Sequence, residues 1–177
     1  MSKIPLHESA TGFTKGKSIL NNALPHKNKK AILKLDLLKY FDSIYERRVY
    51  GIFKSIGYAK NLSYDLAILT TVELPQEYLK TFEEKELKSY REIVPKISCV
   101  LPQGAPTSPT LSNLILRRLD LRLSKLAEKL KVDYSRYADD ITFSGEVENL
   151  PKIKLLRYII RDEGLNINWK KVGIYKK

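Results

Sequence analysis

The sequence is poor in residues that crosslink or anchor a chain, with one cysteine, Cys99, and two histidines among 177 residues. A lone cysteine excludes an internal disulfide and the thiolate clusters of structural zinc sites. No apolar run approaches the roughly 20 residues of a membrane-spanning helix, and the N-terminus lacks the apolar core of a signal peptide. These absences predict a cytoplasmic protein that does not engage a membrane.

Acidic residues are also in the minority. Asp and Glu number 20 against 32 Lys and Arg, which gives a formal net charge of +12. Such an excess favours a polyanionic partner, because positive charge on a folded surface attracts nucleic acid. Hydrophobic residues make up 43% of the chain, so it can build a core, and its length suits one domain.

Residues 1–30 are basic and loop-like, with two features that bear on function. Gly12 and Gly16 stand among lysines, but three residues separate them where a P-loop has four, which excludes nucleotide hydrolysis of that type. His26 has only His7 as a second histidine in the chain. We therefore interpret His26 as a structural or phosphate-neighbouring side chain.

Three carboxylates stand at the ends of expected strands. The alternation in Ala31–Asp36 predicts a strand that ends at Asp36. Asp139 and Asp140 lie between two strand-forming runs, which predicts a hairpin with both carboxylates at its tip. Like charges so close repel unless a cation lies between them. The structural alternatives are a strand-ending aspartate and a solvated Asp-Asp turn.

If the two strands are antiparallel neighbours, the three carboxylates can share two divalent ions. In-line phosphoryl transfer uses a pair of metals roughly 3.5–4 Å apart. Oxygen ligands suit Mg²⁺ better than zinc. The arrangement therefore predicts a nucleotidyl-transfer site with two Mg²⁺.

The loop Val100–Pro109 holds three prolines and a glycine just before an expected helix. Prolines restrict the backbone, and the start of a helix offers free N–H groups to a phosphate or a base. Gln103 could form hydrogen bonds there. A rigid loop with a purely structural role is the alternative.

Apolar periodicity predicts four helices. The first begins at Asp42-Ser43, where Ser43 and Glu46 form a capping box and Asp42 is a cap or loop anchor. The others span Leu62–Thr71 with its leucines inward, Thr110–Leu130, and the stretch from Pro151 to Gly164. An edge strand is expected through Leu165, Ile167 and Trp169, before a basic tail.

Four motifs, in this order, resemble those of the palm of reverse transcriptases. They are Leu35-Asp36 followed by Phe41-Asp42, the loop Leu101–Pro109 with Leu111-Ser112-Asn113, the turn Tyr137–Asp140, and Gly164–Asn168 with Lys171. The bacterial retron and group II intron enzymes are the most similar group. The segment Asn22–His26 is similar to the Asn-Ala-x-x-His signature of retron reverse transcriptases.

The resemblance implies an α+β polymerase palm, in which an antiparallel sheet carrying the catalytic aspartates packs against helices. It implies a single reverse transcriptase domain over residues 1–177, with remnants of fingers in 1–30 and an insertion at about 72–99. Members of the family usually have further finger strands, a primer grip and a helical thumb. The sequence is therefore interpreted as an isolated palm, either a gene fragment or one piece of a split enzyme.

The implied activity is RNA-directed DNA synthesis from a primer 3′-hydroxyl and deoxynucleoside triphosphates, with RNA template and RNA–DNA hybrid bound. In retrons the product is a hybrid RNA–DNA with roles in phage defence. The resemblance makes Asp36, Asp139 and Asp140 the catalytic metal ligands. It places Phe41 under the sugar of the incoming nucleotide, where it excludes a 2′-hydroxyl. Gln103 contacts that nucleotide, and Lys171 lies near the leaving pyrophosphate.

Two other classes stay open. A non-catalytic RNA-binding or assembly subunit could keep the palm fold, although the three intact aspartates argue against it. Another palm-type nucleotidyltransferase, such as a cyclase or an RNA-copying polymerase, is the second. Phe41 favours deoxynucleotides, and the Leu101–Gly104 loop favours reverse transcription. A complementing fingers or thumb polypeptide, or an effector protein, is the expected protein partner.

Overall fold

Residues 4–177 are described by a computed structural model in which two units can be told apart. The chain up to Leu38 together with Leu116–Lys177 is called the sheet unit. Lys39–Ile115 is called the helical unit. Each unit is described by itself.

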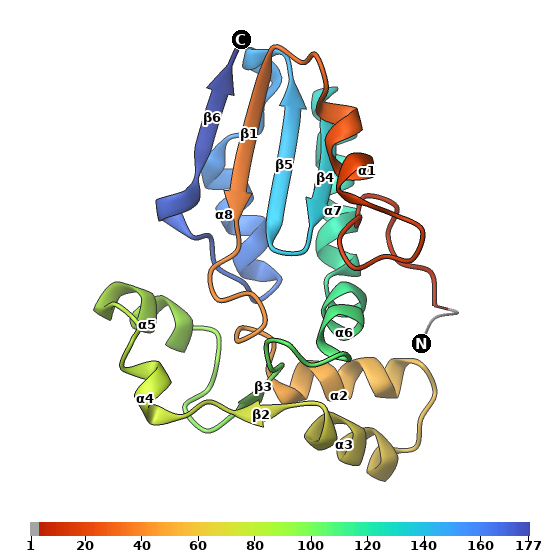
Figure 1. The fold of residues 1–177 in the computed structure, drawn as a ribbon, viewed down its shortest axis with the longest axis vertical. Coiled ribbons are helices and arrows are strands. Elements are labelled where there is room, and N and C mark those ends of the chain that lie inside the picture. The colour runs from red at the N-terminus through yellow and green to blue at the C-terminus, as the bar shows by residue number, and fades with distance from the viewer. Residues whose placement is uncertain (1–3) are drawn as a thin grey trace. The chain divides into compact units, whose positions relative to one another are not determined.

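The sheet unit is built on four antiparallel strands in the order β4-β5-β1-β6 (Figure 1). Their bounds are β1 Ala31–Asp36, β4 Asp133–Tyr137, β5 Asp140–Gly145 and β6 Gly173–Lys176. The predicted strand over 31–36 and the predicted hairpin are confirmed. In β1 the side chains of Leu33 and Leu35 are buried, whereas Lys34 is exposed, as the alternation requires.

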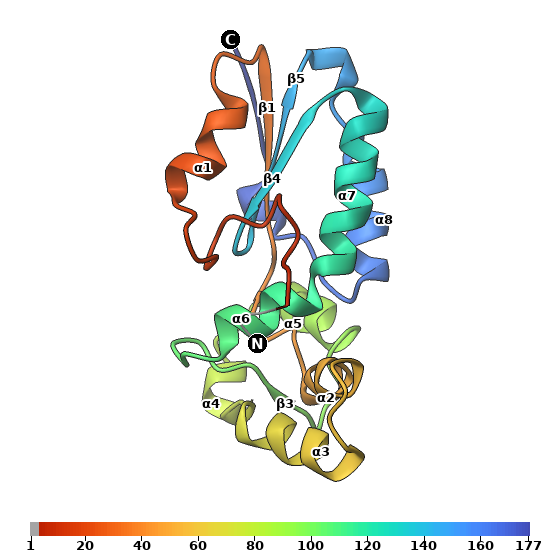
Figure 2. The same ribbon diagram turned by 90° about the vertical axis from the view of Figure 1, so that its right-hand side faces the viewer.

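Helices cover both faces of this sheet. The short helices α1, Ile19–Ala23, and η1, Leu24–His26, lie against one face, and α7, Arg117–Leu130, and α8, Ile153–Asp162, lie against the other (Figure 2). Two further single-turn helices are η2, Val147–Asn149, and η3, Trp169–Lys171. The buried core includes Leu119, Leu123, Phe143, Leu156 and Ile160. The predicted inner face of the helix that ends before Gly164 is confirmed at Leu156 and Ile160.

The helical unit contains five helices and a two-stranded ribbon among its described elements. They are α2 Glu46–Ser55, α3 Lys60–Leu69, β2 Val72–Glu73, α4 Gln76–Leu79, α5 Glu84–Arg91, β3 Cys99–Val100 and α6 Ser108–Ile115. The segment from 72 to 99 has an apolar cluster of its own, with Phe82, Tyr90 and Val94 packed around Val100. Across residues 4–177 no helix is long and apolar enough to cross a membrane.

The predicted start of the first helix was wrong. Helix α2 begins at Glu46 with Tyr45 as its N-cap, and no capping box involves Ser43. The reason is a pair of turns, because the Ser43 N–H donates to the Lys39 carbonyl and the Ile44 N–H donates to the Phe41 carbonyl. Those bonds hold residues 39–44 in a loop, and the backbone becomes extended at Tyr45, directly before the helix.

The predicted inner face of α3 was also wrong. Ser63 and Ala67 are the residues of α3 that are buried, while Leu62 and Leu69 are 45% and 79% exposed. Helix α3 packs against α2, and small residues let two helix backbones approach closely. Packing with a neighbouring helix therefore overrode the leucine pattern.

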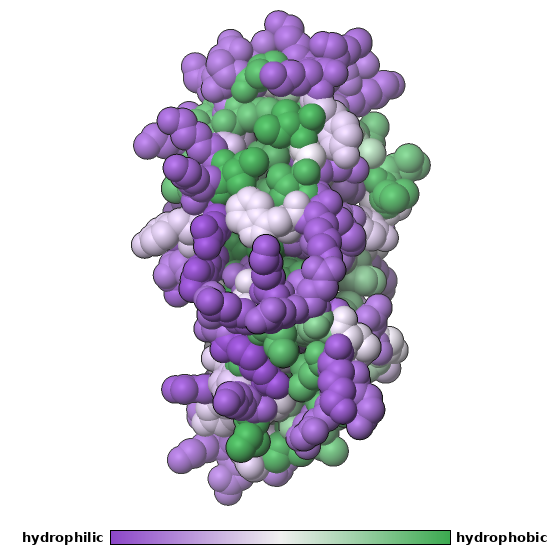
Figure 3. All heavy atoms as spheres, turned by 90° about the vertical axis from the view of Figure 1, so that its left-hand side faces the viewer, coloured by the Kyte–Doolittle hydropathy of each residue, from purple (hydrophilic) through white to green (hydrophobic). Residues whose placement is uncertain are grey.

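Two predicted elements differ in extent or position. The helix expected over 110–130 is two helices, α6 and α7, separated at Leu116, whose backbone has φ −85° and ψ 2°. The edge strand is β6, formed by residues assigned to the basic tail, whereas Leu165 and Ile167 are buried in a loop. Strand β6 is exposed at Ile174 and Tyr175, so it lacks an apolar alternation. Figure 3 shows the side on which β6 lies, where hydrophobic side chains gather over the sheet unit.

Candidate active site

The hydrogen-bond register of the sheet unit brings the predicted carboxylates to one place. Asp36, the last residue of β1, is the direct partner of Asp140, the first residue of β5. Asp139 lies in the tight turn between β4 and β5, and its carbonyl accepts the Leu37 N–H at 3.0 Å. Ala138 has a left-handed backbone with φ 55°, which turns the chain between the two strands. The pairing register of β1 with β5 and the turn between β4 and β5 therefore bring the three aspartates together.

The pKa values of the two hairpin carboxyls, Asp139 and Asp140, are both raised. Partial burial raises the pKa of Asp139, and the negative charges of Asp36 and Asp140 raise it further. Partial burial and the charge of Asp36 likewise raise the pKa of Asp140. Lys171 acts against both shifts. Raised carboxyl pKa values at a shared site are typical of groups arranged for a cation.

Asp36 has partners of its own. Its side chain is 7% exposed, and its Oδ1 accepts a hydrogen bond from Asn168 Nδ2 at 2.9 Å. Its Oδ2 lies 2.8 Å from Lys171 Nζ, and this bond raises the pKa of the lysine. The Asn168 N–H also donates to the Asp36 carbonyl. The sequence placed Asn168 and Lys171 in one motif, but it did not predict that both side chains bind the Asp36 carboxylate.

The side chains are not arranged as a finished metal site. Among residues 4–177, no three His, Cys, Asp or Glu side chains converge as a metal-binding group. Asp36 turns its oxygens toward Asn168 and Lys171. The residues nevertheless fit Mg²⁺ chemically, because all three are carboxylates and the Lys171 side chain that contacts Asp36 is 63% exposed rather than locked in the core. A divalent cation would also relieve the repulsion at Asp139 and Asp140.

Comparison with known proteins identifies the family. The family model described as reverse transcriptase (RNA-dependent DNA polymerase) matches residues 2–177. The chain belongs to the reverse transcriptase family. It is 39% identical to a retron Mx65 reverse transcriptase of Myxococcus xanthus over its whole length, and 37% identical to a retron Ec86 reverse transcriptase of Escherichia coli over 98% of it. The chain spans 40% and 47% of those two relatives. The antiparallel sheet with helices packed on it thus agrees with the α+β palm expected of a reverse transcriptase.

Among solved structures, one of apo telomerase from Candida tropicalis is similar to this chain. The similar region covers 83% of this chain and 30% of the telomerase chain. The TM-score is 0.48 and the sequence identity is 13%.

A hollow of about 610 Å³ opens beside Asp140 in this reverse transcriptase chain. Its lining comes from the sheet, including Lys34 and Tyr137, and from α1 and η1, including Leu20 and Leu24. Leu20 and Leu24 are exposed, and Lys27 adds a second positive charge. The hollow joins apolar contact surface and positive charge next to a candidate metal ligand.

His26 has a structural role, which was the first of the two interpretations given for it. It is buried, with Nδ1 2.6 Å from Ser144 Oγ and Nε2 2.7 Å from Ser135 Oγ. Burial lowers the pKa of its imidazole, so the neutral ring is favoured. His26 therefore fastens η1 to β4 and β5 through two hydroxyls.

Phe41 and Gln103 belong to the helical unit. The Phe41 ring packs edge-on against Tyr40, with centroids 4.9 Å apart, and Gln103 is exposed in the loop before α6. Asp42 is buried and accepts a hydrogen bond from the Tyr78 hydroxyl at 2.8 Å, which confirms it as a loop anchor. The nucleotide contacts expected of Phe41 and Gln103 stay predictions.

Proposed function

We propose that the chain is the palm segment of a retron-type reverse transcriptase, an RNA-directed DNA polymerase that extends a primer 3′-hydroxyl with deoxynucleotides. The observation that carries the proposal is the pairing of Asp36 with Asp140 across neighbouring strands, with Asp139 in the adjoining turn. Both units would belong to one reverse transcriptase domain. In the retron setting the enzyme would copy a structured RNA and serve phage defence.

Asp36, Asp139 and Asp140 would hold two Mg²⁺ ions. Bound Mg²⁺ would activate the attacking hydroxyl and neutralise charge on the triphosphate. Asn168 would keep Asp36 oriented through its bond to Oδ1. Lys171 would release Oδ2, and its ammonium would then be available to an anionic phosphate beside the site. The expected place of Lys171 near the pyrophosphate agrees with this movement.

The hollow beside Asp140 would take part of the primer or template strand. Lys27 and Lys34 would bind backbone phosphates, and the apolar side chains of α1 and η1 would contact sugars or bases. In the helical unit, Phe41 would exclude the 2′-hydroxyl of a ribonucleotide, and Gln103 would contact the incoming nucleotide.

Mg²⁺ binding by the purified chain tests the metal site. We expect added Mg²⁺ to raise the melting temperature of the wild type and to have little effect on Asp139→Asn or Asp140→Asn, because each change removes a ligand. Asp65→Asn, at an exposed position of α3, is the matched control and should respond like the wild type. Equal Mg²⁺ shifts in all four proteins would remove the metal-site proposal.

RNA binding and primer extension separate the enzyme from an RNA-binding subunit. The net charge of +12 should give RNA affinity that falls steeply with salt, as counterion release requires. Extension should need the flanking segments that align primer and template, since a misplacement of about 1 Å can cost on the order of 100-fold. A longer enzyme containing this palm should extend a primer, and its Asp140→Asn variant should not. RNA binding without any Asp140-dependent extension would favour the assembly subunit.

A further inference from the structure

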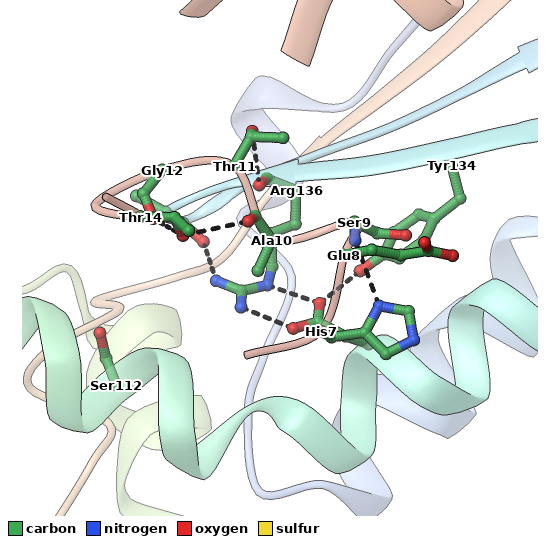
Figure 4. Close-up of polar contacts among 12 residues, drawn as sticks. His7, Glu8, Ser9, Ala10, Thr11, Gly12, Thr14, Ser112, Tyr134 and Arg136 are labelled. Carbon is green, nitrogen blue, oxygen red and sulfur yellow. Dashed lines mark hydrogen bonds and ion pairs between the residues drawn. The ribbon is translucent and has the colours of Figure 1, made fainter. Parts of the chain in front are cut away.

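Arg136 is a fully buried arginine placed just before the aspartate turn. It lies on β4, and its side chain is 0% exposed. A buried guanidinium requires a countercharge and hydrogen-bond acceptors, because an arginine is almost never fully buried without them. Figure 4 shows its nitrogens pointing to acceptors on separate parts of the sheet unit. One set of acceptors lies on helix α7, and another acceptor lies in the turn of the hairpin that carries Asp139 and Asp140.

Asp120, on α7, supplies the countercharge. Its Oδ1 accepts from Arg136 Nε and its Oδ2 from Arg136 Nη2, each at 2.7 Å. The Tyr134 hydroxyl donates to the same Oδ1, also at 2.7 Å. A two-point contact between a guanidinium and a carboxylate fixes the plane of the guanidinium as well as its distance. The remaining nitrogen, Nη1, is thereby aimed in one direction.

That direction is the carbonyl of Ala138, 2.9 Å away. Ala138 has φ 55°, a left-handed conformation that a residue with a Cβ atom does not favour. The bond from Arg136 holds its carbonyl in the orientation that this conformation creates. Asp139 and Asp140 follow directly, so the same bond influences where their carboxylates lie.

The segment Ser9–Gly12 holds the turn from another side. The Arg136 N–H donates to the Ser9 carbonyl, and the Thr11 N–H donates to the Arg136 carbonyl, both at 2.8 Å. A Cβ atom added to Gly12 would lie 2.5 Å from the Ala138 nitrogen. Only glycine permits so close an approach between two backbones. The turn is therefore held by the Arg136 side chain on one side and by the backbone of the Ser9–Gly12 loop on the other.

We infer that Arg136, anchored by Asp120 and backed by Gly12, is a positioning residue that holds Ala138 so that Asp139 and Asp140 stand ready for metal. The inference rests on the proposed function for the role of the two aspartates. A purely structural ion pair would stabilise the sheet unit as a whole. A positioning residue also controls the turn locally and, through it, metal affinity.

The test compares variants at matched stability. Arg136→Met combined with Asp120→Leu removes the bond to Ala138 without leaving a buried charge. Leu156→Ala, a buried position of α8, is a destabilising control that leaves the turn alone. Amide hydrogen exchange of residues 137–141 and Mg²⁺ affinity by calorimetry are measured on the full chain. Gly12→Ala probes the same turn from the other side, and Arg136→Lys keeps the charge but loses the planar contact.

In the paired variant we expect exchange in the turn to rise on the order of 10-fold, because local opening becomes easier. Mg²⁺ affinity should fall by about 10–100-fold, the usual cost of losing a partner that orients metal ligands. Gly12→Ala should show the same two changes, and Arg136→Lys smaller ones. Leu156→Ala should show neither.

Turn exchange in the paired variant equal to that in Leu156→Ala would overturn the inference and leave Arg136 a structural residue. Faster exchange with unchanged Mg²⁺ affinity would also overturn it, because the turn would then not control the ligands. A wild type that binds no Mg²⁺ would instead refute the proposed metal site. The exchange measurement would still decide whether Arg136 controls the turn.

Discussion

Within the sheet unit, the Asp120 carboxylate and the carboxylates of Asp139 and Asp140 differ in the countercharge that the protein supplies. Asp120 is fully buried, yet a guanidinium and a tyrosine hydroxyl meet its oxygens. Asp139 and Asp140 are less buried, yet burial and neighbouring negative charge raise the pKa of each. The protein itself supplies the countercharge of Asp120, whereas the proposed Mg²⁺ would supply that of Asp139 and Asp140. Such a contrast is what a structural ion pair beside the proposed metal site would produce.

Asp42 of the helical unit falls between these extremes. Burial raises the pKa of its carboxyl, while the Tyr78 hydroxyl and the charge of Lys39 oppose that rise. Burial and the bond to Asp42 raise the pKa of Tyr78 to about 12, so its hydroxyl stays protonated and keeps donating. Asp42 thus has a neutral donor where Asp120 has a full countercharge.

Breaking the Asp120–Arg136 pair should have the largest effect on stability. Arg136→Met leaves the Asp120 carboxylate buried without its countercharge, which costs about 3–5 kcal/mol in comparable pairs. Urea unfolding of the single variant and of the double variant with Asp120→Leu measures the difference. The double variant should recover most of the loss. An equal loss in both would show that packing, rather than charge, is what Arg136 supplies.

Tyr78→Phe should have the next largest effect. It removes a hydrogen bond to a buried charged group, a change of about 1.5–3 kcal/mol. The pKa of Asp42 should rise further, because the bond that lowers it is gone. Tyr64→Phe, at an exposed position, is the control and should leave the unfolding free energy unchanged. Equal stability of the two variants would mean that the loop does not depend on this bond.

The hairpin aspartates should behave in the opposite sense, since removing their charge should stabilise the metal-free chain. A carboxyl whose pKa is raised on folding contributes stability that is full below its unfolded pKa and is lost as the pH rises through the folded value. Asp139→Asn and Asp140→Asn should therefore unfold at higher urea concentration than the wild type at pH 7. The gain should disappear as the pH falls toward the ordinary value of 3.8. A gain that grows in acid would contradict this electrostatic account.

The smallest effect on stability is expected for Lys171→Met. The Lys171 side chain is 63% exposed although that of Asp36 is 7% exposed, and Asp36 keeps its bond from Asn168. We therefore expect a loss of about 1 kcal/mol, at the upper end of the range for solvent-exposed pairs. Mg²⁺ should nevertheless bind more tightly, because the ammonium no longer competes for Asp36 Oδ2. Calorimetry with Lys170→Met as the neighbouring control checks this. Weaker Mg²⁺ binding would show that Lys171 supports the site instead of competing for it.

Much of the site was predictable because its signals are local. The alternation in 31–36 and the strand-forming runs around Asp139-Asp140 predicted β1 and the hairpin, and apolar spacing predicted the inner face of α8. These patterns reflect backbone geometry and burial within a few residues. The ordered motifs also pointed to the reverse transcriptase family. The sequence by itself thus determined the local structure that carries Asp36, Asp139 and Asp140, namely a strand end and a hairpin turn.

Only the tertiary structure decided which distant groups serve those carboxylates. Lys171 is 135 positions from Asp36 in the chain, and Arg136 is 16 positions from Asp120. No local pattern links such residues, because their contacts depend on strand register and helix packing. The start of α2, the face of α3 and the identity of β6 were mispredicted for the same reason. Turn hydrogen bonds moved the start of α2, packing against α2 decided the buried face of α3, and pairing with β1 made residues 173–176 the edge strand. Which side chains are buried depends on these contacts between elements, and not on the local sequence pattern alone.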